Sequence, residues 1–400
     1  MAAPAPAVTG RACPLLFVHH RKELGGAPAS LAQLLGALDR SRYDVHVYCP
    51  AGPAAALFRD AGATVHTGPV SCFTHIWAST YHGLRWILFL RELASLPAHV
   101  VAFRRVLGSQ AFQIVHLNDS PLVAAAYLAR RSGVPVVWHL RSALPEHDGR
   151  RSRFLRRVVR RLSAASIAIT DGVAASFDAG SEVIPNSVDL GRFTPGEPEV
   201  PPAVAFIGFL YPWKGFREYL QAAALVRSQG LKARFLVVGG GVRNAAFFHT
   251  PMGRFLEAAG LAHDYEREAH ELAAELGVDG AVSFVPYTPD LVPVYQACAV
   301  VVAPSQGPEL PRPVIEAAAC GVPVIASGSR SGGGIVVPGE TGILVEPGSA
   351  ESIADALHEL LEDTEMRAKM GAAARAHAED AFDCVKNARR VESIYRRVSG

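Results

Sequence analysis

Two series of short apolar runs, with a helix-forming stretch after most of them, restrict the fold of this chain more than any other feature. The first series includes the runs Leu15–His19 and Val134–His139 and the helical stretches Ser30–Leu38 and Pro121–Arg131. Because a parallel strand needs a crossover to reach its neighbour, this alternation predicts a parallel, doubly wound sheet. The other strands predicted in this series are Asp44–Tyr48, Ala63–His66, Ile114–Leu117, Ser166–Ile169 and Glu182–Ile184.

A segment rich in proline and glycine, Pro185–Val200, separates the two series and is predicted to be a domain linker. The length of 400 residues fits about two domains of ~150–200 residues. We therefore predict an α/β chain with two Rossmann-like domains, residues 1–188 and 189–384, and a ligand site in the cleft between them. The strands predicted in the second series are Val204–Ile207, Arg234–Val238, Ala281–Phe284, Val300–Ala303, Val322–Ala326 and Gly342–Val345.

The composition argues against several classes of protein. Lys and Arg total 39 against 37 acidic residues, and a dedicated nucleic-acid-binding protein would normally show a basic excess. The six cysteines follow no pairing or zinc-binding spacing, so we expect reduced thiols and no metal site. The apolar run near the N-terminus is too short for a signal peptide or a membrane span, so a cytoplasmic protein is expected.

The stretch PELPRPVIEAAACGVPVIA, Pro308–Ala326, predicts a short helix followed by a buried strand. Pro313 suits the first helical position, Glu316 would follow in the first turn, and Gly321 would end the helix. The free amides of such a helix terminus suit an anionic ligand.

Two glycine-containing loops follow predicted strands. Gly25 and Gly26 lie between the first strand and the first helix, where they predict either a phosphate or sugar contact or a plain turn. They are not part of a GxGxxG fingerprint, which argues against a dinucleotide site. In the second series, IGFLYPWKGF places Gly208 at a strand end and Lys214 before a helix. Lys214 could neutralise a phosphate leaving group or could be an ordinary surface lysine.

Polar side chains also lie where two strands of the first series end. His139 is at the tip of the run VVWHL, and Asn118 and Asp119 follow the strand before it. Ligands of open α/β sheets bind outside these strand ends. His139 could bind a ligand or cap loop backbone, and Asn118 and Asp119 could contact an acceptor hydroxyl or form an Asx turn.

Arg150–Leu162 carries seven arginines on one predicted helix. A solvated face is the first explanation, and peripheral contact of Arg150–Arg161 with an anionic membrane surface or acceptor is the alternative. Phe73–Gly108 is a long insertion with Trp77 and Tyr81, for which a packed helical pair is favoured over an acceptor site lined by aromatic residues.

Taken together, these motifs resemble the retaining, nucleotide-sugar-dependent glycosyltransferases of the GT-B fold, in glycosyltransferase family 4, also called group 1. The resemblance covers nearly the whole chain, with the motifs in the family's order. They are GGAPAS, VVWHL, IPNSVDLGRF, IGFLYPWKG, the unit APS…PVIEAAACGVPVIAS, and GETGILVEPG.

The resemblance implies transfer of a sugar from a nucleoside diphosphate, UDP or GDP, to an acceptor hydroxyl, without a metal or another cofactor. It implies that Lys214 contacts the donor diphosphate, Glu316 the ribose and His139 the transferred sugar, and that a last helix, about 385–400, packs back on the first domain. Asn118 and Asp119 are the acceptor candidates. The donor-site candidates are Gly25, Gly26, Gly208, Lys214, Glu309, Arg312, Pro313, Val314 and Glu316.

Three positions depart from the family pattern. Phe209 replaces an arginine, Pro308 replaces the first of two glutamates so that Glu309 is one position closer to Glu316, and Gly334 replaces an acidic residue. Each change removes a polar donor contact. These losses motivate alternative functions, a non-catalytic sugar-nucleotide-binding partner subunit, or a sugar-nucleotide epimerase or hydrolase of the same architecture.

Overall fold

A computed structural model describes residues 12–72, 86–144, 149–241, 243, 245–286, 288–307, 312–327 and 334–399. The chain divides into two compact units. The first combines Met1–Pro185 with Cys384–Gly400, and the second is Asn186–Asp383. The chain therefore leaves the first unit once and returns to it for the last helix.

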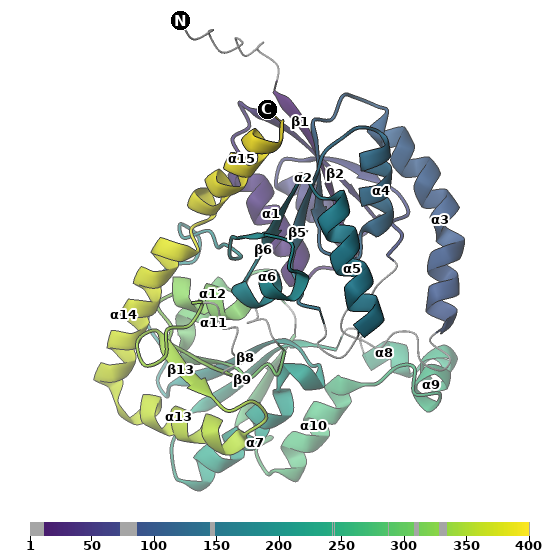
Figure 1. Cartoon of the computed structure of the whole chain (residues 1–400). Coiled ribbons are helices and arrows are strands. Elements are labelled where there is room, and N and C mark those ends of the chain that lie inside the picture. The colour runs from purple at the N-terminus through teal and green to yellow at the C-terminus, as the bar shows by residue number, and fades with distance from the viewer. Residues whose placement is uncertain are drawn as a thin grey trace, which may run out of the picture. The chain divides into compact units, whose positions relative to one another are not determined.

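The described strands of the first unit form a seven-stranded parallel sheet in the order β3-β2-β1-β4-β5-β6-β7 (Figure 1). The strands are β1 Cys13–Val18, β2 Tyr43–Cys49, β3 Thr64–Thr67, β4 Ile114–Asn118, β5 Val136–Leu140, β6 Ala165–Ala168 and β7 Glu182–Val183. The helices are α1 Gly26–Ala37, α2 Pro53–Asp60, α3 Trp86–Leu107, α4 Val123–Arg131, α5 Gly149–Leu162, α6 Asp171–Phe177 and α15 Cys384–Ser399.

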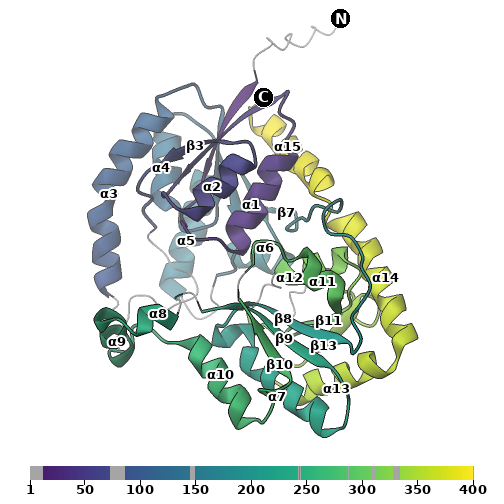
Figure 2. The same cartoon turned by 180° about the vertical axis from the view of Figure 1, so that it is seen from behind.

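Helices cover both faces of this sheet, which explains why its central strands are apolar throughout. Leu16 and Val18 of β1 pack on one face with residues of α3 to α6. Leu15 and Phe17 pack on the other face with α1, α2 and α15, the helices nearest the viewer in this unit in Figure 2. Tyr395 of α15 is buried in this second layer, so the C-terminal helix is part of the first unit's core.

The second unit repeats the architecture with a six-stranded parallel sheet, in the order β10-β9-β8-β11-β12-β13. Its described strands are β8 Ala203–Phe209, β9 Arg234–Gly240, β10 Val282–Val285, β11 Cys298–Ala303, β12 Val324–Ser327 and β13 Gly342–Val345. Its α-helices are α7 Phe216–Ser228, α8 Ala245–Phe248, α9 Pro251–Ala258, α10 Tyr265–Glu275, α11 Val292–Ala297, α12 Arg312–Ala319, α13 Ala350–Glu362 and α14 Thr364–Ala381. The layer of α7, α10 and α13 covers one face, and α11, α12 and α14 cover the other.

The structure corrects three details predicted from the sequence. The first helix begins at Gly26 rather than Ser30, because Gly25 already accepts a backbone hydrogen bond from Ala29. The helix α12 begins at Arg312 rather than Pro313, which places Glu316 in the second turn. The predicted linker Pro185–Val200 lies almost wholly in the second unit, where Val188 and Phe193 are buried in its core.

The predicted domain boundary at residue 188 lies three residues beyond the division found in the structure. For the insertion Phe73–Gly108, the structure describes one helix, α3, and residues 73–85 with Trp77 and Tyr81 lie outside the described part. In the part of the chain that is described, no helix has the length and apolar character needed to cross a membrane.

Candidate functional site

Each sheet has a point where the strand order reverses, between β1 and β4 in the first unit and between β8 and β11 in the second. Open α/β sheets bind ligands outside the carboxyl ends of the strands at such a point. In the first unit, the residues at this edge include His19 after β1, Asn118 at the end of β4 and His139 near the end of β5. Because β4 lies between β1 and β5, these three side chains belong to adjacent strands.

A chain of hydrogen bonds fixes the orientation of His19. The guanidinium Nε of Arg141 donates to Oδ1 of Asn118, so the amide nitrogen of Asn118 must point the other way. That nitrogen donates to Nδ1 of His19 at 2.8 Å. Since Nδ1 of His19 accepts a hydrogen bond, the neutral ring carries its proton on Nε2.

The Nε2 atom of His19 is buried and has no hydrogen-bond partner among the described residues. Burial, assisted by the nearby cations Arg141 and Arg21, lowers the pKa of His19 to about 3. His19 is therefore a neutral N–H donor at neutral pH. An unpaired buried donor is costly, which makes it a candidate ligand contact.

A second chain of contacts ends at His139. The hydroxyl of Tyr395 lies 2.8 Å from Nδ1 of His116, and Nε2 of His116 lies 3.3 Å from Nδ1 of His139. The phenol hydrogen of Tyr395 has no other acceptor among the described residues, so we assign it to His116. His116 then donates from Nε2 to His139, which leaves the proton of His139 on Nε2.

The Nε2 atom of His139 is also buried without a hydrogen-bond partner in the described structure. Burial, with Arg141 and His116 nearby, holds the pKa of His139 well below its usual value, and the pKa of His116 is lowered to about 3 by the same burial. The carboxyl edge of the first sheet thus has two neutral N–H donors, on His19 and His139. Such donors suit the hydroxyl oxygens of a sugar or an acceptor.

Asn118 and Asp119 are buried and engaged within this edge. Asn118 uses its side-chain amide on His19 and Arg141. Asp119 has a positive φ of 103°, and its Oδ1 accepts from the backbone N–H groups of Ser120 at 2.8 Å and Arg141 at 3.3 Å. Burial raises the pKa of Asp119. Both residues therefore connect the end of β4 to the ends of the neighbouring strands that carry the two histidines.

Of the glycine pair after β1, Gly25 precedes α1 and Gly26 is its first residue. In the second unit, Gly208 is next to last in β8. Lys214 ends a single 3₁₀ turn, η2 Pro212–Lys214, directly before α7.

The loop after β8 is tied to the loop after β11. The carbonyl oxygen of Trp213 accepts hydrogen bonds from the backbone N–H of Gln306 at 2.8 Å and from the hydroxyl of Ser305 at 3.3 Å. Gly215 has a φ of 80°, and a Cβ there would collide with the carbonyl oxygen of Pro304. Only glycine lets the two loops approach so closely. This contact places Lys214 at the reversal point of the second sheet.

Glu316 is buried, and two side chains hold its carboxylate. The hydroxyl of Tyr295 donates to Oε2 at 2.7 Å, and Nε of Arg312 donates to Oε1 at 2.6 Å. Burial, together with the negative charge of Glu316, raises the pKa of Tyr295 well above its usual value, so the phenol keeps its proton. Of the neighbouring donor-site candidates, Val314 is buried in the core and Pro313 is half-buried. Glu309 lies outside the described residues.

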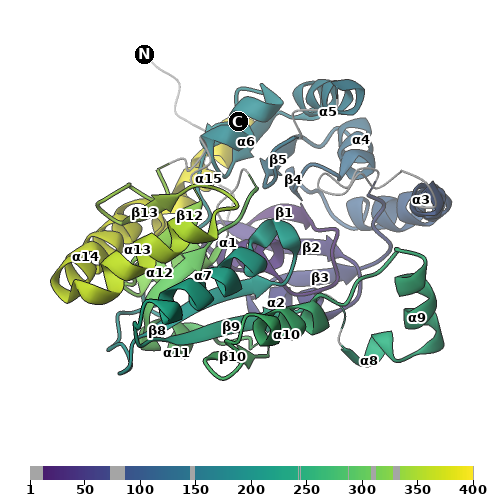
Figure 3. The same ribbon diagram turned by 90° about the horizontal axis from the view of Figure 1, so that it is seen from below.

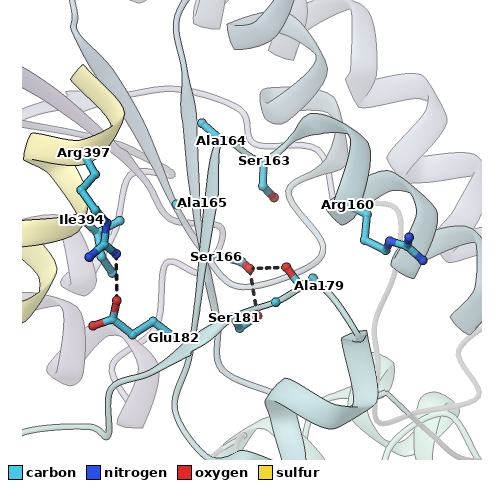
Figure 4. A pocket seen from close by; sticks show the side chains of 11 residues that line it. Arg160, Ser163, Ala164, Ala165, Ser166, Ala179, Ser181, Glu182, Ile394 and Arg397 are labelled. Atoms are coloured by element: carbon cyan, nitrogen blue, oxygen red, sulfur yellow. Dashed lines mark hydrogen bonds and ion pairs between the residues drawn. The ribbon is translucent and has the colours of Figure 1, made fainter. Parts of the chain in front are cut away.

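A cavity of about 330 Å³ lies elsewhere in the first unit, at the amino ends of β6 and β7 (Figure 4). Arg160, Ser163 and Arg397 contribute to its wall. Ser181 donates to Ser166 at 2.9 Å, and Arg397 pairs with Glu182 at 2.8 Å. This cavity is at the edge of the sheet opposite His19 and His139, so it is separate from the candidate site.

Comparison with known proteins shows the family. Residues 25–186 match the family model described as a glycosyl transferase 4-like domain, and residues 189–377 match the model of glycosyl transferases group 1. A D-inositol 3-phosphate glycosyltransferase of Saccharomonospora viridis is 31% identical, over 90% of this chain and 86% of that protein. The chain belongs to the group 1 glycosyltransferase family.

Two further similarities agree with this assignment. A D-inositol 3-phosphate glycosyltransferase of Corynebacterium urealyticum is 28% identical over 80% of this chain and 79% of its own length. Among solved structures, Anabaena HepE in complex with UDP and glucose superposes with a TM-score of 0.75. That match covers 96% of this chain and 100% of HepE at 21% identity. The two doubly wound units therefore have the GT-B fold of group 1 glycosyltransferases, as the sequence resemblance implied.

Several residues of this glycosyltransferase site escaped prediction from sequence. His19 closes the predicted strand Leu15–His19, so the strand-end rule that singled out His139 applies to it equally. Arg141 lies two residues beyond His139 and could have been found in the same way. Tyr295 and Tyr395 carry no comparable signal, since each reaches its partner only through the folded core.

Proposed function

We propose that this glycosyltransferase moves a sugar from a nucleoside-diphosphate sugar to an acceptor hydroxyl, with retention of anomeric configuration and without a metal ion. The observation that carries the proposal is His139, a neutral buried histidine with an unpaired Nε2 at the carboxyl end of β5. An N–H group fixed in this way can donate a hydrogen bond to a sugar hydroxyl oxygen without a change in the protonation state of the histidine. The resemblance to retaining enzymes supports retention.

The second unit would bind the donor. Lys214, held at the reversal point by the contact between the β8 and β11 loops, would stabilise the departing diphosphate. Glu316 would contact the nucleoside ribose while Tyr295 and Arg312 hold its carboxylate in place. The solved complexes of HepE contain UDP, UDP with glucose, or UDP-glucose, which supports a uridine nucleotide as the first donor to test.

In the proposed reaction, the bond from the anomeric carbon to the diphosphate oxygen breaks, and its electron pair stays on that oxygen. The acceptor oxygen forms the new bond to the anomeric carbon on the same face, and the acceptor proton passes to the departing diphosphate. His139 and His19 would hold the sugar and the acceptor, and they neither gain nor lose a proton. Positioning and charge stabilisation would then account for the rate.

The acceptor proposed first is a phosphorylated cyclitol. The name of the Saccharomonospora viridis relative, a D-inositol 3-phosphate glycosyltransferase, supports this choice. None of the six cysteines forms a disulfide with another described residue, which agrees with the proposed cytoplasmic location.

Purified protein incubated with UDP- and GDP-sugars and inositol phosphate tests the proposal. We expect release of nucleoside diphosphate only when the acceptor is present, an α-linked product from an α-linked donor, and no loss of rate with EDTA. Lys214→Ala should lower kcat at least tenfold, because it removes about 1.5–3 kcal/mol of charge-assisted stabilisation. The control Lys232→Ala, on an exposed lysine after α7, should not. Equal turnover of both variants would contradict the role of Lys214.

Phe209 favours one alternative function. It is at the end of β8, where the family pattern has an arginine, and its ring lies 6.3 Å from that of Tyr211. A sugar-nucleotide-binding subunit without catalysis would tolerate this loss of charge. Calorimetry distinguishes the two functions, because tight donor binding without product formation would favour the binding subunit. Donor consumption without any acceptor would instead indicate an epimerase or hydrolase.

A further inference from the structure

Three neighbouring helices of the first unit concentrate positive charge. In sequence, α3, α4 and α5 carry twelve arginines and one acidic residue, Glu92, a net charge of +11. The whole chain has 39 basic and 37 acidic residues, so the remainder has 27 basic and 36 acidic residues, a net charge of −9. Such an asymmetry indicates an anionic partner for this part of the molecule.

These helices form one layer on the first sheet. α4 contacts both α3 and α5, and all three pack on the sheet through the same core cluster (Figures 1 and 3). Their other faces are exposed. We call the exposed residues of α3, α4 and α5 the arginine face.

Most of the arginines on this face are not neutralised. Seven of them make neither an ion pair nor a side-chain hydrogen bond with any described residue. Glu92 is buried, accepts a hydrogen bond from the backbone N–H of Cys72 at 3.0 Å, and pairs with Arg91 at 2.8 Å, so it offers little counter-charge to the surface. The seven are Arg104, Arg105, Arg130, Arg131, Arg150, Arg157 and Arg161.

Apolar side chains lie among these charges. On α3, Leu90 is 60% exposed and Val101 is 61% exposed, and the helical period places them on one stripe with the exposed Pro97. On α4, Tyr127 is 53% exposed, three and four residues before Arg130 and Arg131.

The outer side of α5 repeats this pattern. Phe154 is 53% exposed, and Arg150, Arg157 and Arg161 share its side of the helix at spacings of four, three and seven residues. Leu155 and Val159 face the core instead. Each of the three helices therefore presents apolar or aromatic side chains beside arginines.

We propose that the arginine face docks on an anionic lipid surface. Arginines attract the negative head groups, while Leu90, Val101, Tyr127 and Phe154 enter the boundary between head groups and acyl chains. A nucleic acid would match the charge but has no apolar layer in which aliphatic side chains could be buried. Charge complementarity and the exposed apolar side chains together therefore favour a membrane. The inference does not depend on glycosyl transfer.

Vesicle sedimentation of the whole protein tests this inference. We expect sedimentation with mixed phosphatidylglycerol–phosphatidylcholine vesicles, but not with pure phosphatidylcholine vesicles, and a steep loss of binding at high salt. The triple variant Arg104→Gln, Arg130→Gln and Arg157→Gln should bind about 100-fold more weakly, from about 1 kcal/mol per arginine. Leu90→Ser with Phe154→Ser should weaken binding about tenfold.

A matched control removes three exposed arginines from other helices. Arg227→Gln, Arg389→Gln and Arg396→Gln change the net charge equally and should leave vesicle binding within about twofold, because these arginines lie outside the arginine face. Equal weakening by both triple variants would show a net-charge effect and overturn the proposal. Binding to random-sequence duplex DNA by a protein that does not sediment with vesicles would also overturn it. All substituted residues are exposed, so the variants should fold.

Discussion

At the scale of residues, two histidines at one sheet edge are each kept in one tautomer by neighbours distant in sequence. Asn118 fixes His19, and Tyr395 fixes His139 through His116. Each tautomer leaves an N–H on Nε2 without a partner among the described residues. A ligand hydroxyl would recover the hydrogen bond that folding leaves unmade. The two chains of hydrogen bonds thus fix the N–H donors of His19 and His139 before any ligand binds.

Tyr395→Phe should change the tautomer of His139 without removing a group that would contact the ligand. Without the phenol, His116 can take either tautomer, so a fraction of His139 loses its proton from Nε2. We expect kcat to fall about tenfold, the effect of one hydrogen bond of ~1.4 kcal/mol. Nitrogen-15 NMR should show mixed tautomers of His139.

Tyr43→Phe is the matched control for this experiment, since Tyr43 packs against Tyr395 with ring centroids 5.8 Å apart and contacts no histidine among the described residues. It should lower stability slightly and leave both kcat and the tautomer unchanged. An unchanged His139 tautomer in Tyr395→Phe would refute the inference that Tyr395 fixes this tautomer through His116.

At the scale of elements, the carboxylate of Glu316 stabilises the position of its own helix, α12. Glu316 in the second turn binds Arg312 one turn earlier and Tyr295 of α11. The side chain predicted to bind a ribose is thus buried, and its two oxygens have partners already. Its role in binding a donor would be to accept a further hydrogen bond from a fixed position.

Tyr295→Phe tests this role of Glu316. Removing the phenol donor leaves the buried carboxylate with one partner fewer and should lower the free energy of unfolding by about 1.5–3 kcal/mol. If Glu316 binds the donor, the Kd for the nucleotide should rise about tenfold, measured by calorimetry.

Tyr219→Phe separates stability from binding. Its hydroxyl is equally buried, but it bonds the backbone carbonyl oxygens of Val204 and Leu236 rather than a site residue. It should lower stability and leave the Kd unchanged. A rise in the Kd of the same size in both variants would contradict a specific role for Tyr295.

The strands were more predictable from sequence than the site. β13 was predicted with its observed bounds, Gly342–Val345, and the other strands within a few residues, because strands buried on both faces are continuous apolar runs. The start of α1 was missed because Gly25 and Gly26 resemble a turn. Tyr295 and Glu316 are 21 residues apart, and Tyr395 and His116 are 279 apart. Contacts formed by packing leave no local pattern at such separations.

At the scale of the whole molecule, charge and protonation are unevenly distributed. The arginine face carries the basic excess, and the buried histidines of the first unit include His19, His116 and His139. The pKa of each is lowered mainly by burial, to about 3 for His19 and His116, and well below the usual value for His139. The folded state therefore binds fewer protons than the unfolded state between pH 6.5 and about 3.

Stability should consequently fall as the pH falls through 6.5. Each histidine is expected to lower the free energy of unfolding by about 2 kcal/mol between pH 7 and pH 5. Burial raises the pKa of Asp119. This carboxyl group therefore has the opposite effect, because it lowers the free energy of unfolding as the pH rises, and it does so only above the usual pKa of an aspartate. Urea unfolding of the first unit, followed at several pH values, measures the slope.

His19→Gln should make that slope measurably smaller, while the side-chain carbonyl oxygen of the glutamine still accepts from Asn118. A slope unchanged by this substitution would mean that His19 does not remain neutral in the folded protein.

The return of the chain to its first unit has a consequence for synthesis. Tyr395 comes after the whole second unit in the chain, yet it sets the tautomer of His139. Until α15 has been synthesised, the first sheet lacks one of the helices that cover its second face. The residues of the second unit leave the ribosome before that helix does. His139 can acquire its final protonation pattern only after the second unit and α15 have been synthesised, so a chain that stops before α15 would lack the fixed N–H donor of His139.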